Sequence, residues 1–187
     1  MAKKLSRKTL IIQCATEFSK KGYHGTSMSD LALACGGIEK SHFYYYFNGK
    51  DELFIEVLLY ILAEAEKHIF EIMGLKQMSE EEKLEEIVTH ALSYHKKPYN
   101  RLIALTATQI SSIPMVETKE IIHDFFELWR KNLTRIYKST HKKKKAKNLA
   151  LLSTQDLQGA IILSEFYPKD DIIRMSLERA FDRLVED

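Results

Sequence analysis

The sequence has few residues that interrupt helices, with three prolines and seven glycines among 187 residues. Because proline and glycine are the two poorest helix formers, their scarcity favours a helical chain. The chain is 45% hydrophobic and 29% charged, which is ordinary for a protein with a buried core and excludes disorder over the whole length. Its length fits one large domain, or a small domain joined to a larger one.

Cysteine is also scarce. Cys14 and Cys35 are the only two, too few for a disulfide framework, and they show no metal-ligand spacing. The simpler interpretation is two small, buried thiols in a reducing cytosol, and a redox switch is the alternative. We expect neither a metal nor a cofactor.

Long apolar runs and enzyme motifs are absent. No uncharged apolar stretch reaches the ~18 residues that a membrane-spanning helix needs. The apolar run LIIQCA near the start is broken by Gln13 and is not typical of a signal peptide. The sequence contains no H-E-x-x-H, no phosphate-binding glycine loop and no G-x-S-x-G. We therefore expect a cytoplasmic protein that does not contact membranes and is not an enzyme.

Positive charge is concentrated in the first quarter of the chain, although the net charge is only +2. Residues 1–50 hold eight Lys/Arg against three Asp/Glu, and residues 51–187 hold 20 against 23. A basic segment on a near-neutral body indicates a polyanion partner for the first part and another task for the second. Charge alone does not separate DNA from RNA or from an anionic membrane.

Hydrophobic periodicity of about 3.6 residues runs through nearly every segment and predicts an all-α fold. Capping signals and breakers set the expected ends. The Lys142 to Lys147 run is expected to be a solvated connector. The predicted helices cover residues 6–21, 28–35, 38–47, 50–74, 79–95, 98–111, a long one from 114, then 153–166 and 169–185.

The three N-terminal helices have the spacing of a helix-turn-helix. Ser27 and Asp30 form a capping-box pattern that begins the second helix, and Gly36-Gly37 end it. A short third helix then follows, behind a longer first helix. This order is typical of proteins that place one helix in a DNA groove.

Five aromatic residues, Phe43 to Phe47, occupy that third helix. At about 100° per residue, Phe43 and Phe47 share one face that can be buried. Lys40, Ser41, Tyr44 and Tyr45 then lie toward the other faces of the helix. Lysine neutralises phosphate, a tyrosine hydroxyl donates to phosphate oxygens and imidazole can bond a base edge, so this face suits a major-groove contact.

The segments TSMSDLA and GIEKSHFYYYFNGKDEL resemble the DNA-binding segment of tetracycline-repressor-type (TetR/AcrR) transcriptional regulators, over about residues 8–55. The resemblance implies a palindromic operator bound by a homodimer and released when a small molecule binds. It implies phosphate contacts from Thr26 and Ser27, base contacts from Lys40, Ser41 and His42, and backbone contacts from Tyr44, Tyr45 and Lys50. Lys50 is expected to be aided by the N-terminus of the helix that it begins.

Three positions depart from the family pattern. Gly36-Gly37 adds one residue to the turn, Glu39 stands where a small capping hydroxyl is usual, and His42 replaces a Thr or Ser. An acid near the helix start favours the helix dipole but repels phosphate. We therefore expect base preference to transfer least from the family.

The remainder of the chain is expected to bind a ligand and form the dimer. The predicted boundary separates a helix-turn-helix domain, residues 1–49, from a helical domain, residues 50–187. The resemblance implies an interface made by the last two helices. An RNA- or protein-binding helical module without ligand switching is the alternative. Residues that could line the ligand pocket, each of which could also be plain core, are Tyr60, Tyr94, Thr106, Gln109, Phe125 and Trp129.

Overall fold

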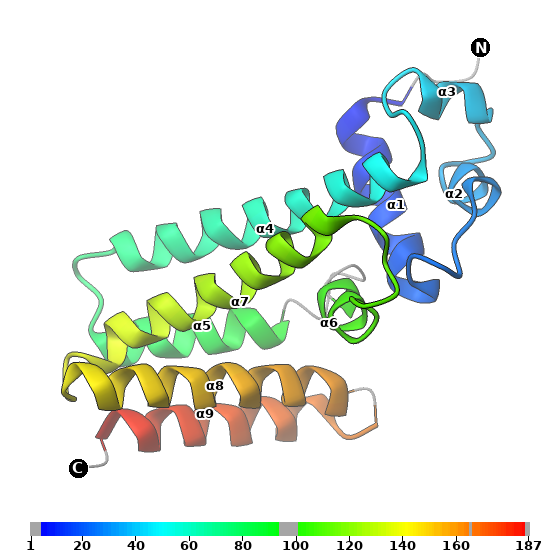
Figure 1. The fold of residues 1–187 in the computed structure, drawn as a ribbon. Coiled ribbons are helices and arrows are strands. Elements are labelled where there is room, and N and C mark those ends of the chain that lie inside the picture. Colours follow the sequence, from blue (N-terminus) through cyan, green and yellow to red (C-terminus); the bar gives the residue numbers. More distant parts are fainter. Residues whose placement is uncertain (1–4, 94–100, 165, 186–187) are drawn as a thin grey trace. The chain divides into compact units, whose positions relative to one another are not determined.

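The computed structural model describes residues 5–93, 101–164 and 166–185. These residues form helices without a strand (Figure 1), so the prediction of an all-α fold is confirmed. No helix in the described ranges is long and apolar enough to cross a membrane. The helices are α1 (Arg7–Lys21), α2 (Met28–Ala34), α3 (Lys40–Tyr44), α4 (Lys50–Gly74), α5 (Glu80–Ser93), α6 (Arg101–Thr108), α7 (Val116–Tyr137), α8 (Lys143–Leu163) and α9 (Lys169–Val185).

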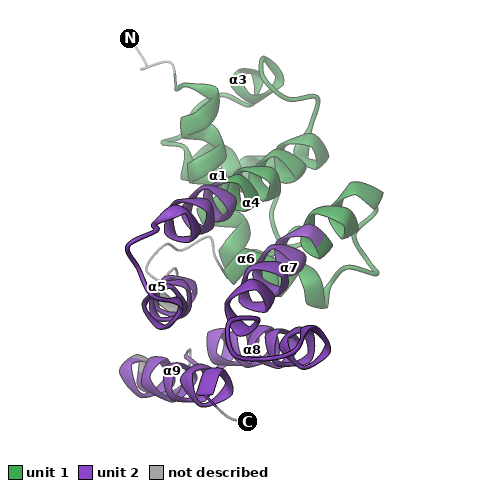
Figure 2. Cartoon of the chain, turned by 90° about the vertical axis from the view of Figure 1, so that its left-hand side faces the viewer, with its two compact units in different colours: residues 1–63, 97–123 green, residues 64–96, 124–187 purple. Residues whose placement is uncertain are grey.

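The chain divides into two compact units (Figure 2). Unit 1 comprises residues 1–63 and 97–123, and unit 2 comprises residues 64–96 and 124–187. The boundaries fall inside α4 and α7, so each of these helices contributes to both units. The predicted division at residue 49 is a different one, and it remains a prediction about function.

Unit 1 is built around α1, which packs against α2 and α6. The fully buried Phe18 of α1 meets Phe54 of α4 edge to face, with ring centroids 4.9 Å apart. Gly22 ends α1 with φ of +70°, a backbone conformation that residues with a side chain rarely adopt. A Cβ at Gly22 would also lie 2.9 Å from Oε1 of Gln109. This glycine therefore lets the loop after α6 approach the end of α1.

Unit 2 is held by the packing of α5, α8 and α9 on one another. A buried polar cluster lies among their apolar contacts. Arg183 donates to Oγ of Ser153 at 3.1 Å, Ser153 lies 2.7 Å from the hydroxyl of Tyr137, and Tyr137 donates to the Ala180 carbonyl. Arg183 also pairs with Asp156 at 2.5 Å. Every member has a partner, so the cluster joins α7, α8 and α9 without leaving a buried donor unpaired.

The predicted connector at Lys142 to Lys147 is wrong. Lys142 is the N-cap of α8, and the helix continues without interruption to Leu163. Ser153, predicted to cap a new helix, lies buried inside α8. Packing explains the difference, because Ala146 and Ala150 are fully buried and hold the first turns of α8 despite their four lysines.

Two other predicted helix starts are confirmed, and one predicted helix is shorter. The capping boxes at Ser27 with Asp30 and at Ser79 with Glu82 are both formed. The third helix contains only Lys40–Tyr44 instead of 38–47. The predicted start of α6 at Pro98 lies outside the described residues.

Candidate nucleic-acid interface

The start of α2 is fixed by an ionic and hydrogen-bonded network. Oγ of Ser27 accepts from the backbone N–H of Asp30, and the Asp30 carboxylate accepts from the Ser27 N–H at 2.8 Å and also from the Ser27 hydroxyl. Lys21 of α1 pairs with Asp30 at 2.6 Å. The hydrogen bond from Lys21, followed by those from Ser27, holds the pKa of Asp30 well below its ordinary value. Ser27 is exposed, as a phosphate contact requires.

The turn between α2 and α3 is a Schellman motif. The N–H of Gly36 donates to the Leu33 carbonyl and the N–H of Gly37 to the Ala32 carbonyl, both at 3.0 Å. Gly36 and Gly37 have φ of 84° and 74°, which favours glycine at both positions. The extra residue noticed in the sequence thus completes a regular helix end with two glycines in the left-handed region.

The aromatic run is two-sided, as its spacing predicts. Phe43 is fully buried and Phe47 is 2% exposed, whereas Tyr44 and Tyr45 are 57% and 69% exposed. Lys40 and Ser41 are exposed on the same short helix. Burial of the phenylalanines therefore leaves cationic and hydroxyl groups facing outward, which are the groups that bind phosphate oxygens and base edges.

His42 and Glu39 are engaged within the unit. Nε2 of half-buried His42 lies 3.1 Å from the Leu5 carbonyl and therefore donates to it. Glu39 is the N-cap of α3, yet its side chain does not cap the helix and instead accepts from the Ser41 hydroxyl at 3.1 Å. His42 thus holds the residues that precede α1 against α3, and its base contact remains a prediction.

Thr26 and Lys50 lie in local hydrogen bonds that sequence reasoning did not anticipate. Thr26 is 1% exposed and its hydroxyl donates to the Gly22 carbonyl at 2.7 Å, and its phosphate contact remains a prediction. Nζ of Lys50 donates to the carbonyls of Tyr23 and Thr26 at 3.0 and 3.2 Å, and it lies 4.1 Å from the Tyr23 ring centroid. Both side chains support the loop between α1 and α2.

Tyr23 is the residue at this loop that sequence reasoning missed. Its hydroxyl donates to Asp51 at 2.5 Å, and burial followed by that hydrogen bond raises its pKa to about 12. Its ring also packs on Phe54. The available signal was weak, because both partners lie on α4, 28 and 31 positions further along the chain.

The predicted pocket residues fall in both units, and the pocket remains a prediction. Tyr60, Thr106 and Gln109 belong to unit 1, Phe125 and Trp129 belong to unit 2, and Tyr94 lies outside the described residues. Three buried atoms, Oγ1 of Thr106, Oε1 of Gln109 and Nε1 of Trp129, have no hydrogen-bond partner among the described residues. A buried polar atom without a partner costs about 1–3 kcal/mol, so a polar group bound at any one of these atoms would offset that cost.

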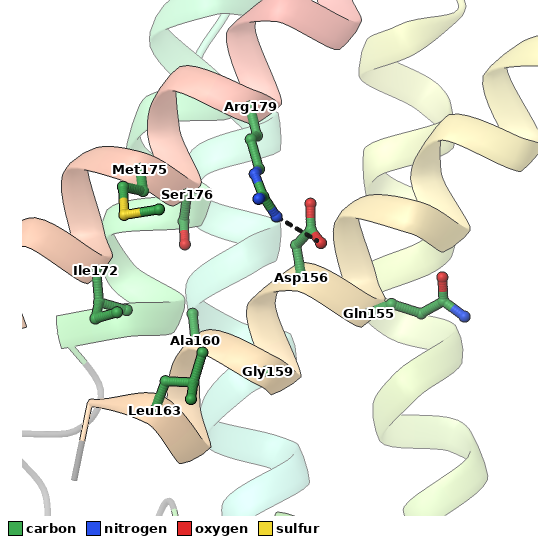
Figure 3. Close-up of a pocket in the computed structure, with 9 residues that line it drawn as sticks. All are labelled: Gln155, Asp156, Gly159, Ala160, Leu163, Ile172, Met175, Ser176 and Arg179. Carbon is green, nitrogen blue, oxygen red and sulfur yellow. Dashed lines mark hydrogen bonds and ion pairs between the residues drawn. The ribbon is translucent and has the colours of Figure 1, made fainter. Parts of the chain in front are cut away.

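A groove with a volume of about 210 Å³ lies between α8 and α9 (Figure 3). None of the predicted pocket residues lines it. Its apolar residues include Leu163 on α8, and Ile172 and Met175 on α9. At one edge Arg179 pairs with Asp156 at 3.4 Å. Several apolar side chains of these helices and their connection are exposed, namely Leu151, Leu152, Ile162, Leu163, Phe166, Tyr167 and Met175.

Comparison with known proteins finds a family match over the segment that contains α2 and α3. Residues 14–57 match the family model described as bacterial regulatory proteins, tetR family. Residues 14–57 belong to the tetR family. This tetR-family segment runs from α1 into α4 and contains all of α2 and α3, and the resemblance recognised in the sequence is confirmed.

A curated relative adds to the comparison. The chain is 30% identical over 102 residues to the HTH-type transcriptional regulator YhgD of Bacillus subtilis strain 168, covering 54% of this chain and 45% of that protein. The chain therefore spans less than half the length of this curated relative.

Solved structures show the same fold over nearly the whole chain. A TetR transcriptional regulator from Legionella pneumophila has a TM-score of 0.83 at 20% identity, covering 95% of this chain and 97% of that one. AibR, solved in complex with isovaleryl coenzyme A and operator DNA, has a TM-score of 0.68 at 14% identity, covering 91% and 95%. The tetR-family segment thus belongs to an all-helical fold with a helix-turn-helix at its N-terminus.

The geometry of Lys50 predicts a stabilising role. Replacing it by Met removes two hydrogen bonds from a charged donor and a cation–π contact, and should lower the free energy of unfolding by about 1–3 kcal/mol. Urea unfolding followed by far-UV circular dichroism measures the change. Lys40→Met, at the exposed start of α3, is the matched control and should stay within about 0.5 kcal/mol of the unsubstituted protein. Unchanged stability of Lys50→Met would contradict the role and return Lys50 to phosphate binding.

Proposed function

We propose that this protein is a DNA-binding transcriptional regulator of the tetR type, a ligand-responsive repressor that binds a palindromic operator as a homodimer. The observation that carries the proposal is the two-sided segment of residues 40–47, whose phenylalanines are buried while Lys40, Ser41, Tyr44 and Tyr45 are exposed. The basic first quarter of the chain supports it, since phosphate contacts supply most of the affinity for DNA. Residues 1–49 would read DNA, and residues 50–187 would bind the effector and the second copy.

The contacts can be assigned more closely than sequence allowed. Lys40, Ser41 and one edge of His42 would meet bases, while Ser27, Tyr44 and Tyr45 would bind the phosphate backbone. Thr26 and Lys50 would act indirectly, because they fix the loop that ends at the N-cap of α2. A helix as short as α3 reads few base pairs, which is why two copies and two half-sites are needed.

The second copy would dock on the exposed apolar face of α8 and α9. The groove in Figure 3 gives this face a recess that a side chain of the partner can enter. An apolar patch rimmed by polar residues is typical of protein interfaces. Because each copy presents the same face, a twofold pair would match the symmetry of an inverted repeat.

The effector would be an acyl-coenzyme A thioester. The support is the complex of AibR, which shares this fold, with isovaleryl coenzyme A and operator DNA, together with the unpartnered buried Nε1 of Trp129 in unit 2. Such a ligand releases DNA only if it binds the DNA-incompetent arrangement more tightly than the competent one.

Competitive selection from random duplex DNA should enrich an inverted repeat whose half-sites are centred about 10 base pairs, or a multiple of that distance, apart. Tyr44→Phe should then weaken binding to the enriched duplex by about 0.5–1.5 kcal/mol per protomer, because one phosphate hydrogen bond is lost. Thr108→Val is the control, since it removes an exposed hydroxyl from α6, outside the proposed DNA and dimer surfaces. Fluorescence anisotropy of the labelled duplex measures both variants.

His42→Ala provides a separate readout in the same selection. A base contact predicts a changed preference at one position of each half-site, whereas loss of the Leu5 contact alone predicts uniform weakening across sequences. Failure to enrich any inverted repeat would contradict the proposed function and favour an RNA- or protein-binding module.

Charge on the α8–α9 face should separate the dimer. Ile162→Glu and Met175→Glu place carboxylates at positions that are about half exposed in the single chain, and each should convert a dimeric protein to monomers because a buried unpaired charge costs several kcal/mol, on the order of 3–5. Phe70→Glu, on the α4 segment of unit 2, is the control for an added charge at an exposed apolar position. Sedimentation velocity gives the masses, and a monomeric unsubstituted protein would contradict this interface.

Binding of an acyl-coenzyme A should change the fluorescence of Trp129, the single tryptophan of the chain, because its buried ring has an unpartnered Nε1. We expect one range of acyl lengths to shift the emission and to release the selected duplex, and free coenzyme A to do neither. Trp129→Phe should lose the optical signal and should need more ligand for duplex release, because the Nε1 donor is lost. If no acyl chain length affects either emission or duplex binding at millimolar concentration, the effector class is wrong.

A further inference from the structure

The two cysteines of the chain lie side by side in unit 1. Cys14 is in the middle of α1 and Cys35 is the C-cap of α2, 21 positions later. Their sulfur atoms are 3.8 Å apart, and the residues are 0% and 3% exposed. A disulfide bond is about 2.05 Å long, so the sulfurs need to approach by only about 1.8 Å to form one.

The contact gives the two thiols different acidities. A hydrogen bond from the Cys14 thiol lowers the pKa of Cys35. The same contact, followed by burial, raises the pKa of Cys14. Cys35 is therefore the sulfur that ionises first, and a thiolate is the form that attacks oxidants. Cys14 keeps its proton beside it, as a resolving thiol does.

Cys35 is buried but directly precedes an exposed turn. The next two residues, Gly36 and Gly37, are exposed, and a Cβ at either one would meet nothing within 4 Å. The preceding α2 has only seven residues. A short helix that ends at an open glycine turn is the kind of element that opens locally at low free-energy cost.

Cys35 is also connected to α3 through the glycine turn. Its N–H donates to the Leu31 carbonyl, and the Schellman bonds of Gly36 and Gly37 follow directly. Glu39, two residues after Gly37, is the N-cap position of α3. A bond that draws Cys35 toward α1 therefore displaces the turn from which α3 begins.

We propose that Cys14 and Cys35 are an oxidation site, at which a hydroperoxide converts the two thiols to a disulfide, and that this disulfide weakens operator binding. The oxidation itself is independent of the function proposed above, whereas its effect on the operator rests on that function. No metal or cofactor takes part.

The chemistry balances with the peroxide as the only co-reactant. The Cys35 thiolate attacks the terminal oxygen of R–O–O–H, the O–O bond breaks, and with one proton the products are a sulfenic acid on Cys35 and the alcohol R–OH. The Cys14 sulfur then attacks the Cys35 sulfur, the S–O bond breaks, and the Cys14 proton leaves with the hydroxyl as water. Two thiols are oxidised and one peroxide is reduced.

The test uses the full chain, hydrogen peroxide and the selected operator duplex. After a stoichiometric pulse, intact mass should fall by two hydrogens, and trypsin should give a cross-linked pair of peptides, residues 9–20 and 22–40. Duplex affinity measured by anisotropy should fall at least tenfold, and dithiothreitol should restore it. Cys14→Ala and Cys35→Ala should each bind the duplex as the reduced protein does.

The two variants also establish the order of attack. Peroxide followed by dimedone should label Cys35 in Cys14→Ala, because its sulfenic acid cannot be resolved, and should leave Cys35→Ala unlabelled. Thiols that survive the peroxide in the folded protein would overturn the oxidation site, and a cross-link that leaves duplex affinity unchanged would overturn the switch. If the reduced protein selects no DNA, the proposed function fails, while the mass measurement still decides the oxidation site.

Discussion

The burial of Phe43 and Phe47 is the contact on which the candidate DNA-binding surface depends. A helix of five residues is not stable alone, because the cost of nucleating a helix exceeds what so few hydrogen bonds return. The fold therefore holds α3 by the buried ring of Phe43 within the helix and that of Phe47 just after it, which are 0% and 2% exposed. Burying each ring contributes about 1.5–3 kcal/mol. Every outward-facing side chain of α3 takes its direction from that anchoring.

Polar contacts complete what the rings begin. Lys50, Tyr23 and Asp51 connect the start of α4 to the loop before α2, and Lys21 with Asp30 connects the end of α1 to α2 itself. These contacts position the elements around α3 at angles that apolar packing alone leaves loose. Apolar burial is non-directional and holds the elements together, whereas hydrogen bonds from a lysine to two carbonyls set an orientation.

The sequence predicted the features that depend on neighbouring residues. The all-α fold, the two capping boxes and the two-sided aromatic run follow from spacings of three or four positions, and the structure contains them. The sequence did not predict the start of α8, because the residues buried there, Ala146, Ala150 and Ser153, are small or polar. They therefore give no hydrophobic periodicity.

The side-chain roles that were missed depend on partners far along the chain. Lys50 bonds carbonyls 24 and 27 positions away, and His42 bonds one 37 positions away. No local pattern encodes such pairs. The family resemblance placed all these residues near DNA, and the coordinates separate those that face outward from those that hold the loop.

Unit 1 has a consequence for synthesis, because it joins residues 1–63 to residues 97–123. The end of α1 is covered by Leu105 and Gln109, and His24 bonds Ser112 at 3.1 Å. During synthesis, some 70 further residues must be added after position 49 before the residues that cover the end of α1 are present. At 5–20 residues per second this takes about 4–15 s. Until then the end of α1 lacks this cover, so unit 1 can be completed only after residue 123 has been synthesised.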